Sequence, residues 1–415
     1  KKSPIFQATF ITDSGLLAKI DALVYDDLMD SWTIYEVKSS TGVSRTKDDN
    51  HVHDVTFQKL VVSEAGVSVD RTYLVHLNKD YRRAGHLKIF DLFRIDDITD
   101  DVEKEYPKIA HEAENALELL AARDIDLSYC SCLYQSRRNH CSSFGVLNKG
   151  IPDYSIHDIA RISEKSLKEL LDMVVMNIFD IPEDFKLTKI QKTQVELAKT
   201  QTPIIDRAGI KETLAQLKFP LIFFDYETYV SAIPQVDGFG PHQHIPFQVS
   251  IHIMESDGSL RHYEYLADEV ENASADLVEF LVRTVPAEGT IVSWHASFEN
   301  TRNREVSEIY PEHSGFLLGL NDRTFDLEKI FKEYYHHPDF RGKTSIKKVL
   351  PVLCPDFSYK DLDIQSGTEA MENWHRVIFD DLPPDEKARI RESLLEYCKL
   401  DTLAMVEIFK HLTRL

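Results

Sequence analysis

Two acidic residues on one predicted strand form the strongest chemical pattern in the sequence. Asp225 and Glu227 stand at positions i and i+2 of the apolar run LIFFDYETYV. Side chains alternate along a strand, so both carboxylates are expected on the same face. Two carboxylates side by side at the end of a buried strand repel each other, and a divalent cation is the usual relief. Alone, such a pair is more often a solvated strand end than a site.

Two later segments supply residues that complete the pattern. The run DEKARIRESLLEYCKLDTLAMVEIFKHL predicts one long amphipathic helix, on which Tyr397 and Asp401 are four residues apart and share a face. Between the two ends, IVSWHASFENTR predicts a strand that runs into a helix, with His295 and Glu299 also four residues apart. Each pair taken alone is typical of an ordinary helix surface, so the combination carries the argument.

In this order the three segments resemble the motifs of the DEDD (DnaQ-like) 3′-to-5′ exonucleases, in the branch with a tyrosine before the last aspartate. The resemblance covers residues 219 to 415 and implies an RNase H-like fold. It implies that Asp225, Glu227 and Asp401 hold two Mg²⁺ or Mn²⁺ ions and that Tyr397 orients the attacking water. Glu299 departs from the pattern, because it stands where the family has an aspartate.

The chemistry of phosphodiester cleavage agrees with this assignment, since two metal ions about 3.5 to 4 Å apart can stabilise both the attacking and the leaving oxygen. The segment HHPDFRGKTSIKKVLPVL adds Arg341, Lys343, Lys347 and Lys348. These residues are either contacts for a phosphate backbone or a solvated loop and helix start. Phe247 and Gln248 are either a face for the terminal nucleotide or, the favoured reading, part of a plain buried strand.

A second acidic pattern lies near the beginning of the sequence. Asp21 closes one predicted strand, and Glu36 and Lys38 lie on the next, pointing the same way. Carboxylates bind a divalent ion, and a nearby lysine can position or deprotonate water and neutralise phosphate charge. A lone pair like Glu36 and Lys38 is usually a surface pair, but Gln58 follows on a predicted helix.

This D-x14-ExK spacing with a following glutamine resembles the PD-(D/E)XK nucleases, in particular the RecB-like branch that includes CRISPR-associated adaptation nucleases. The resemblance implies a restriction-endonuclease-like fold, metal binding by Asp21 and Glu36, and catalytic roles for Lys38 and Gln58. Two features differ: Val62 stands where the family has a tyrosine, and the family's upstream acid would precede or border Lys1.

Three of the five cysteines crowd together as Cys130, Cys132 and Cys141, which is no disulfide framework. They are similar to the late cysteines that, in several RecB-like relatives, hold a [4Fe-4S] cluster with one earlier cysteine. Two alternatives stay open for the cysteines: a tetrahedral zinc site with His140 as fourth ligand, or three reduced structural thiols. The nearby Arg137 and Arg138 either contact phosphate or are solvated residues of this loop.

Length and composition set the frame for these sites. A chain of 415 residues with 43% hydrophobic and 28% charged residues predicts a globular α/β protein of more than one domain. We expect a nuclease domain at 1–150, a helical connection at 151–217 and an exonuclease domain at 218–415. Predicted strands in the first domain cover 17–25, 32–37, 71–77 and 87–92. The first residue, Lys1, indicates that this numbering begins inside a longer product.

The formal charge of −21 argues against nonspecific adhesion to nucleic acid, although bound metal ions can reverse the field at one site. No signal-peptide or membrane-spanning pattern is present, so a soluble cytoplasmic protein is expected. The first hypothesis is a metal-dependent nuclease acting 3′ to 5′ on single-stranded or frayed ends, in DNA repair, processing or defence. The alternative is a nucleic-acid clamp or partner-dependent effector with a degenerate N-terminal domain. The sequence leaves open whether the substrate is DNA or RNA, whether the protein forms homo-oligomers and whether it has protein partners.

Overall fold

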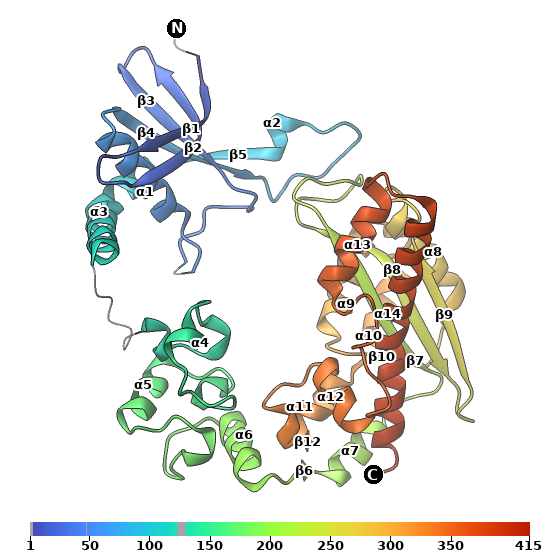
Figure 1. Ribbon diagram of the computed structural model, residues 1–415. Helices are drawn as coiled ribbons and strands as arrows, with labels where there is room; N and C mark the ends of the chain where they lie inside the picture. Colours follow the sequence, from blue (N-terminus) through green and yellow to red (C-terminus); the bar gives the residue numbers. More distant parts are fainter. Residues whose placement is uncertain (1–2, 47, 123–129) are drawn as a thin grey trace. The chain divides into compact units, whose positions relative to one another are not determined.

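The computed structural model describes residues 3–46, 48–122 and 130–415 (Figure 1). In these ranges it is an α/β protein with two mixed sheets of five strands each, so the predicted class is confirmed. The chain divides into two compact units. The first unit is Lys1–Ile125 together with Val230–Gln243, and the second unit is Asp126–Tyr229 together with His244–Leu415. No helix in the described ranges is long and apolar enough to cross a bilayer.

The first unit is built on a sheet of order β1-β2-β3-β4-β5. β1, β2 and β3 are antiparallel neighbours, β3 and β4 are parallel, and β4 and β5 are antiparallel. The parallel pair requires a crossover, which the helix α1 supplies. The elements are β1 (Ile5–Ile11), β2 (Leu17–Asp26), β3 (Ser31–Val37), α1 (His51–Glu64), β4 (Val69–Leu77), α2 (Ile89–Leu92), β5 (Phe93–Asp97) and α3 (Thr99–Ala121).

The core of the first unit lies between this sheet and the helices α1 and α3. Ile20, Ile34 and Leu74 from β2, β3 and β4 are fully buried and belong to one cluster with Val55 of α1 and Val102 of α3. The alternating strand residues therefore give the sheet one apolar face, and the helices cover it. The predicted strands at 17–25, 32–37 and 71–77 are confirmed as β2, β3 and β4.

The predicted strand at 87–92 is wrong. The chain forms a loop and the short helix α2 there, and pairing with β4 begins only at Phe93, opposite Leu77. Within α2 only Leu92 is buried, whereas Ile89 is 62% exposed and Phe90 is 100% exposed. An apolar run normally becomes a strand because it gains a buried face, and in this run only Leu92 is buried.

The second unit begins with short helices around a small core of their own. Their core includes Ile156, Leu167, Leu170, Ile178 and Val195. The strand β6 pairs with the distant β12 in an antiparallel two-stranded sheet. The elements are η1 (Ser131–Tyr134), η2 (Arg137–Asn139), α4 (Phe144–Leu147), η3 (Ile156–Asp158), α5 (Glu164–Asp172), η4 (Ile178–Asp180), α6 (Lys189–Thr200), β6 (Ile204–Ile205) and α7 (Arg207–Leu214).

The larger part of the second unit is a sheet of order β11-β10-β7-β8-β9, with β7 in the centre. β10 runs parallel to both β7 and β11, and β8 is antiparallel to β9. The elements are β7 (Leu221–Val230), β8 (His244–Met254), β9 (Leu260–Leu266), α8 (Ala273–Thr284), β10 (Thr290–Ser293), α9 (Ser297–Ile309), η5 (Pro311–His313), α10 (Ser314–Asp322), β11 (Thr324–Asp326), α11 (Glu328–Glu333), β12 (Tyr335–His336), η6 (Pro338–Phe340), α12 (Ile346–Leu353), α13 (Gly367–Phe379) and α14 (Pro384–Leu412).

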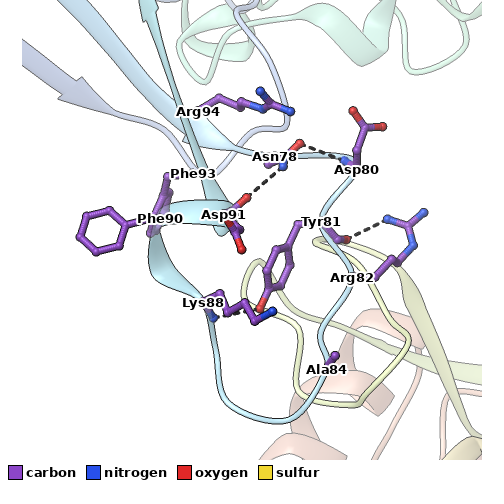
Figure 2. A pocket seen from close by; sticks show the side chains of 10 residues that line it. All are labelled: Asn78, Asp80, Tyr81, Arg82, Ala84, Lys88, Phe90, Asp91, Phe93 and Arg94. Carbon is purple, nitrogen blue, oxygen red and sulfur yellow. Dashed lines mark hydrogen bonds between the residues drawn. The ribbon is translucent and has the colours of Figure 1, made fainter.

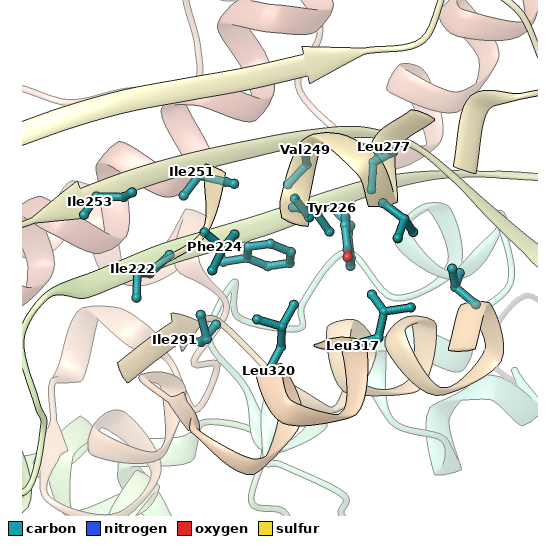
Figure 3. Packing of buried hydrophobic residues seen from close by; sticks show 14 residues of the cluster. Ile222, Phe224, Tyr226, Val249, Ile251, Ile253, Leu277, Ile291, Leu317 and Leu320 are labelled. Carbon is teal, nitrogen blue, oxygen red and sulfur yellow. The ribbon is translucent and has the colours of Figure 1, made fainter. Parts of the chain in front are cut away.

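The two faces of β7 have different partners. Ile222, Phe224 and Tyr226 pack into a cluster with side chains of β8, α8, β10 and α10 (Figure 3). The intervening residues turn to the other face, where Phe223 meets Phe409 of α14 with ring centroids 5.8 Å apart. The alternation of the strand therefore places the odd-numbered residues of β7, including the two acids, on the side of α14.

Candidate active site

The two acids of β7 lie together as predicted. Ligand atoms of Asp225, Glu227 and Cys398 are all within 4.8 Å of one another. Cys398 comes from α14 and is fully buried, and its thiol lies 4.0 Å from Oδ2 of Asp225. Burial, followed by the charge of Asp225, raises the pKa of the Cys398 thiol well above its usual value. The raised pKa favours the protonated thiol, which leaves the two carboxylates as the better candidate ligands for a hard cation.

The helix α14 brings Tyr397 and Asp401 to the same region, as its predicted face requires. Asp401 is only 8% exposed, and its Oδ1 accepts a hydrogen bond of 2.6 Å from the Tyr359 hydroxyl. Asp401 is not one of the three residues within 4.8 Å, but its charge raises the pKa values of both Asp225 and Glu227. The four motif residues on β7 and α14 thus form one electrostatically coupled site.

The pKa values of these acids are raised, chiefly by burial. Burial and then the charge of Asp401 raise the pKa of Glu227 to about 8. Burial raises the pKa of Asp401 to about 6, although the hydrogen bond from Tyr359 and the charge of Lys347 oppose the rise. The pKa of Asp225 is raised by burial and by the neighbouring carboxylates. Carboxylates that resist ionisation for this reason gain strongly from a bound cation.

Lys347 is the basic side chain at this site. Its ammonium donates a 3.0 Å hydrogen bond to the hydroxyl of Tyr397 and another to the carbonyl of Gln365. It also lies 4.9 Å from the ring centroid of Tyr397 and 5.2 Å from that of Tyr359, within cation–π range. One lysine thus faces several acids, too few positive charges for all of the carboxylates to be ionised together.

Glu299, the predicted second-motif acid, lies on α9 and is 3% exposed. Its Oε2 is buried and has no hydrogen-bond partner among the described residues. Burial, reinforced by the charge of Asp326, raises the pKa of Glu299 to about 8. A buried carboxylate oxygen without a donor is costly, so this side chain has unused capacity to bind a cation. Its charge also contributes to the raised pKa of Asp225.

The predicted pairing of His295 with Glu299 on one helix face is wrong. The helix α9 begins only at Ser297, and His295 precedes it with a left-handed backbone, φ 61°. Its ring nitrogen Nδ1 instead lies 2.9 Å from Glu328, and its backbone N–H donates to Asp326 at 3.0 Å. The spacing of four residues therefore does not correspond to one turn of helix here.

Oxygen-rich sites with several adjacent carboxyl groups suit hard divalent cations. Asp225, Glu227 and Asp401 supply the carboxyl groups here, and a cation would allow them to be ionised together. Tyr359 was not found from the sequence. It lies in the irregular segment between α12 and α13, so no periodicity marks it; only a fold that brings it to α14 can.

The N-terminal pattern also converges. The Glu36 carboxylate accepts a 2.9 Å hydrogen bond from the Gln58 amide and forms an ion pair of 2.8 Å with Lys38. Burial raises the pKa of Glu36, with the Lys38 and Gln58 hydrogen bonds opposing the rise and Asp21 adding to it. Gln58 lies on α1, so the helix position predicted for it is confirmed.

Lys38 is bound more tightly than the sequence pattern implies. Its ammonium forms an ion pair with Asp54 as well as with Glu36. Burial opposes the charge, but the hydrogen bonds to Asp54 and Glu36 outweigh it and raise the pKa of Lys38 to about 12. An ammonium held in this way is no proton acceptor at neutral pH. Asp54 precedes Gln58 by one helical turn, a signal by which it could have been found.

Asp21 already has partners for both carboxylate oxygens. Oδ2 accepts a 2.9 Å hydrogen bond from the backbone N–H of Val37, and Oδ1 accepts one of 2.9 Å from the Gln7 amide. Within the described residues, the first unit contains no group of three metal ligands as compact as the one at Asp225. The acids of the first unit are therefore less suitably arranged to bind a cation than those of the second unit.

The three clustered cysteines are brought together in the second unit, with their sulfur atoms within 4.8 Å of one another. Cys130 and Cys132 are partly buried and Cys141 is exposed. Three convergent thiols fit a soft metal centre. His140 does not join them: its Nε2 lies 2.9 Å from the Gln135 carbonyl, and its ring stacks on Phe144. No fourth cysteine of the described ranges belongs to the group.

Several residues considered as nucleic-acid contacts have partners within the protein instead. Arg341 pairs with Asp153 and covers the ring of Tyr154. Arg137 pairs with Asp158 and donates to the carbonyls of residues 152 and 153. The buried-strand reading of 247 and 248 is confirmed, because Phe247 stacks on Trp374 and Gln248 donates to the carbonyl of residue 394. Lys343, Lys348 and Arg138 are exposed, and none has a side-chain ion pair within the described ranges.

Comparisons with known proteins match part of the region that carries the site. Residues 222–345 match the family described as Domain of unknown function (DUF2779), a stretch that contains Asp225, Glu227 and Glu299. The chain is 23% identical over 374 residues to an uncharacterized protein of Ureaplasma parvum, covering 79% of this chain and 53% of that protein. An uncharacterized protein of Mycoplasma pneumoniae is 28% identical over 228 residues, covering 49% of this chain and 34% of that protein.

A third relative, an uncharacterized protein of Mycoplasma genitalium, is 26% identical over 217 residues, covering 48% of this chain and 32% of that protein. The matched parts therefore span about half of the Ureaplasma relative and about a third of the two Mycoplasma relatives. No solved structure matches the chain significantly.

Proposed function

We propose that this chain is a metal-dependent nuclease whose second unit removes nucleotides from the 3′ end of single-stranded or frayed nucleic acid, with DNA as the favoured substrate. The observation that carries the proposal is the convergence of the partly buried Asp225 with the buried Glu227 and Asp401. Burial raises the pKa values of all three, and the charge of Asp401 raises those of Asp225 and Glu227 further. Ionising these neighbouring carboxyl groups together is unfavourable without a cation and becomes favourable when Mg²⁺ or Mn²⁺ is bound. An RNase H-like fold for residues 218–415 is part of the same proposal.

Two divalent ions held by these carboxylates would stabilise the attacking and leaving oxygens of phosphodiester hydrolysis. The residues of the chain do the rest. Tyr397 has its hydroxyl fixed by Lys347 at 3.0 Å and can orient a water molecule. Lys347 supplies a positive charge for the scissile phosphate. Tyr359 holds Asp401 through its 2.6 Å hydrogen bond. Glu299 supplies a further carboxylate beside Asp225.

The test is digestion of 5′-labelled and 3′-labelled single-stranded DNA and RNA with Mn²⁺, Mg²⁺ or EDTA. Wild-type protein should give a metal-dependent ladder that shortens from the 3′ end, and Asp225→Asn should abolish it. Exposed Glu279→Gln serves as a matched control, because it removes one carboxylate of the same unit away from the site. Equal digestion by wild type and Asp225→Asn would refute the assignment, and digestion of one polymer alone identifies the substrate.

A second function is proposed for the first unit, as a PD-(D/E)XK-type nuclease or a clamp derived from one. The contacts of Glu36 with Lys38 and Gln58 favour the nuclease, since they join the residues that this chemistry needs. The ion pair between Lys38 and Asp54 favours the clamp, since it occupies the lysine. A partner that displaces Asp54 would reconcile the two, which is the form that a partner-dependent effector would take.

The three cysteines extend the proposal to a cofactor. Three convergent thiolates suit a [4Fe-4S] cluster completed by a ligand from outside the described ranges, or zinc completed by water or another donor. Either centre would stabilise the segment that carries Cys130, Cys132 and Cys141. Metal analysis of anaerobically purified protein distinguishes the two centres.

A further inference from the structure

The connection between β4 and β5 in the first unit borders an open, shallow cavity of about 400 Å³ (Figure 2). No function assigned above uses it. Its walls come from one continuous stretch of chain, and they combine cationic, aromatic and polar side chains. They are Asn78, Asp80, Tyr81, Arg82, Ala84, Lys88, Phe90, Asp91, Phe93 and Arg94.

The walls of this cavity are fixed by hydrogen bonds. The buried Tyr81 accepts a 3.2 Å hydrogen bond at its hydroxyl from the backbone N–H of Lys88. The Asn78 amide donates to the carbonyl of Asp91 at 2.9 Å, which ties the start of the loop to α2. Arg82 donates to the carbonyls of residues 79 and 81, each at 2.9 Å. The surface is therefore preorganised, which lowers the entropic cost of binding a ligand.

The neighbouring Arg83 is fully engaged in the same loop. Its guanidinium donates to the carbonyls of Pro234 and Gln235 at 3.0 and 2.8 Å, and it lies 3.5 Å from Asp237. These contacts attach the loop to the segment 230–243 of the same unit. Arg83 thus has a structural role, unlike Lys88 and Arg94 of the cavity lining.

The cavity lining is more cationic than the chain as a whole. It carries three cations against two carboxylates, whereas the whole chain has a formal charge of −21. The side chains of Lys88 and Arg94 are exposed and make no ion pair or side-chain hydrogen bond within the described residues. Cations left unpaired in an acidic protein are available to an anionic ligand.

Phe90 stands beside these cations and is 100% exposed. Figure 2 shows its ring projecting outward from α2, away from Tyr81. Full exposure of a phenylalanine has an unfavourable hydration cost that no packing contact in the described structure offsets. An exposed aromatic ring among unpaired cations is the combination that binds single-stranded nucleic acid, because bases stack on the ring while cations meet phosphates.

We propose that this surface binds single-stranded nucleic acid, with Phe90 stacking on a base and Lys88 and Arg94 contacting flanking phosphates. The exposed apolar residues Leu87, Ile89 and Ile95 nearby would also suit a protein partner. The unpaired cations favour a polyanion over an apolar protein face. This surface would hold the substrate of the proposed nuclease, so the inference rests on the proposed function. Binding of the strand to this surface, however, requires neither metal nor hydrolysis.

The test measures binding of fluorescein-labelled single-stranded DNA and RNA by anisotropy, with full-length protein in EDTA so that no hydrolysis occurs. Phe90→Ala should weaken binding about tenfold, a typical effect of losing one stacked base. Phe90→Trp should retain binding. Lys88→Gln and Arg94→Gln should each reduce the slope of log affinity against log salt by about 0.7, as expected for one lost phosphate contact on a single strand.

Matched controls come from the same unit. Phe6→Ala removes another exposed phenylalanine, 72% exposed on β1, and Lys19→Gln removes another exposed lysine, on β2; neither should change binding. On an abasic oligonucleotide the effect of Phe90→Ala should disappear while the two cation effects persist. Unchanged affinity in Phe90→Ala, or no binding by wild type in EDTA, would overturn the proposal. Loss of hydrolysis with intact Phe90-dependent binding would instead count against the nuclease assignment alone.

Discussion

The hydroxyl of Tyr359 donates a 2.6 Å hydrogen bond to Oδ1 of Asp401, linking an irregular loop to the last helix. This bond keeps the carboxylate closer to its ionised form, because it opposes the rise in pKa that burial causes. A donor placed on a metal-binding carboxylate sets its orientation as well as its charge. The expected behaviour of the site therefore depends on residues outside the sequence motifs.

Replacing Tyr359 with Phe should shift the pH dependence of hydrolysis. The loss of the hydrogen bond raises the pKa of Asp401 above its value of about 6. More of the protein then carries a protonated Asp401 at mildly acidic pH, so activity at pH 6.5 should fall roughly tenfold, the effect of one hydrogen bond to a charged group. Activity at pH 8.5 should fall much less. Tyr335→Phe, another buried tyrosine of the same unit, should leave the profile unchanged; an equal loss at both pH values would contradict the prediction.

The metal-free protein should lose stability as the pH rises. Glu227 and Glu299 have folded-state pKa values of about 8, above the unfolded value of 4.5. Between these values the folded state binds more protons than the unfolded state, so the free energy of unfolding decreases from about pH 4.5 to about pH 8. We expect the melting temperature in EDTA to be several degrees lower at pH 8 than at pH 5.5.

Added Mn²⁺ should reverse this loss at pH 8 and have little effect at pH 5.5. The Glu227→Gln variant should flatten the pH dependence in EDTA, because one of the titrating groups is gone. Exposed Glu279→Gln should keep the wild-type dependence. A melting temperature that rises with pH in EDTA would show that these acids are not the destabilising groups.

Glu299→Gln should separate stability from activity. The amide carries no charge, and the buried oxygen that lacks a partner no longer has an ionised form to desolvate. The metal-free variant should therefore melt at a higher temperature than wild type at pH 8, by a few degrees. Its hydrolysis should fall at least about a hundredfold, as for loss of an essential electrostatic group. Glu299→Asp, which keeps a carboxylate at this position, should keep part of the activity; full activity in Glu299→Gln would exclude a role for this residue.

The N-terminal site is tested in a background without C-terminal activity. In the Asp225→Asn/Asp401→Asn double variant, any remaining metal-dependent cutting should disappear on Lys38→Ala. Asp54→Asn in the same background should increase that cutting several-fold, because it frees Lys38 from one ion pair. Lys19→Ala is the control on an exposed lysine of the same unit. No cutting in any of these variants would leave the first unit as a clamp.

The cysteine group should bind a metal that can be measured directly. Anaerobically purified protein should contain either iron with sulfide and a broad visible absorption or about one zinc per chain. Cys132→Ser and Cys141→Ser should each remove most of that metal and lower the melting temperature by several degrees. Cys354→Ser, which changes a cysteine outside the group, should retain the metal. Equal metal content in all three variants would exclude the group as a metal centre.

The periodicity of the sequence determined which residues share a face of a strand or helix. Alternation within LIFFDYETYV was enough to put Asp225 and Glu227 on one face, because a strand has only two faces. The helical period was enough to join Tyr397 to Asp401, because residues four apart on a helix share a face. The α/β class followed from the same two periods.

Other features depended on contacts that no local period encodes. His295 lies outside α9 because its own backbone is left-handed and the helix begins only at Ser297. The run at 87–92 forms a loop and the helix α2 because only Leu92 finds an apolar surface to pack against. Tyr359 contacts Asp401 only through tertiary packing. Sequence periods fix which side of an element a residue occupies, whereas its partners, burial and pKa depend on which elements the fold brings together.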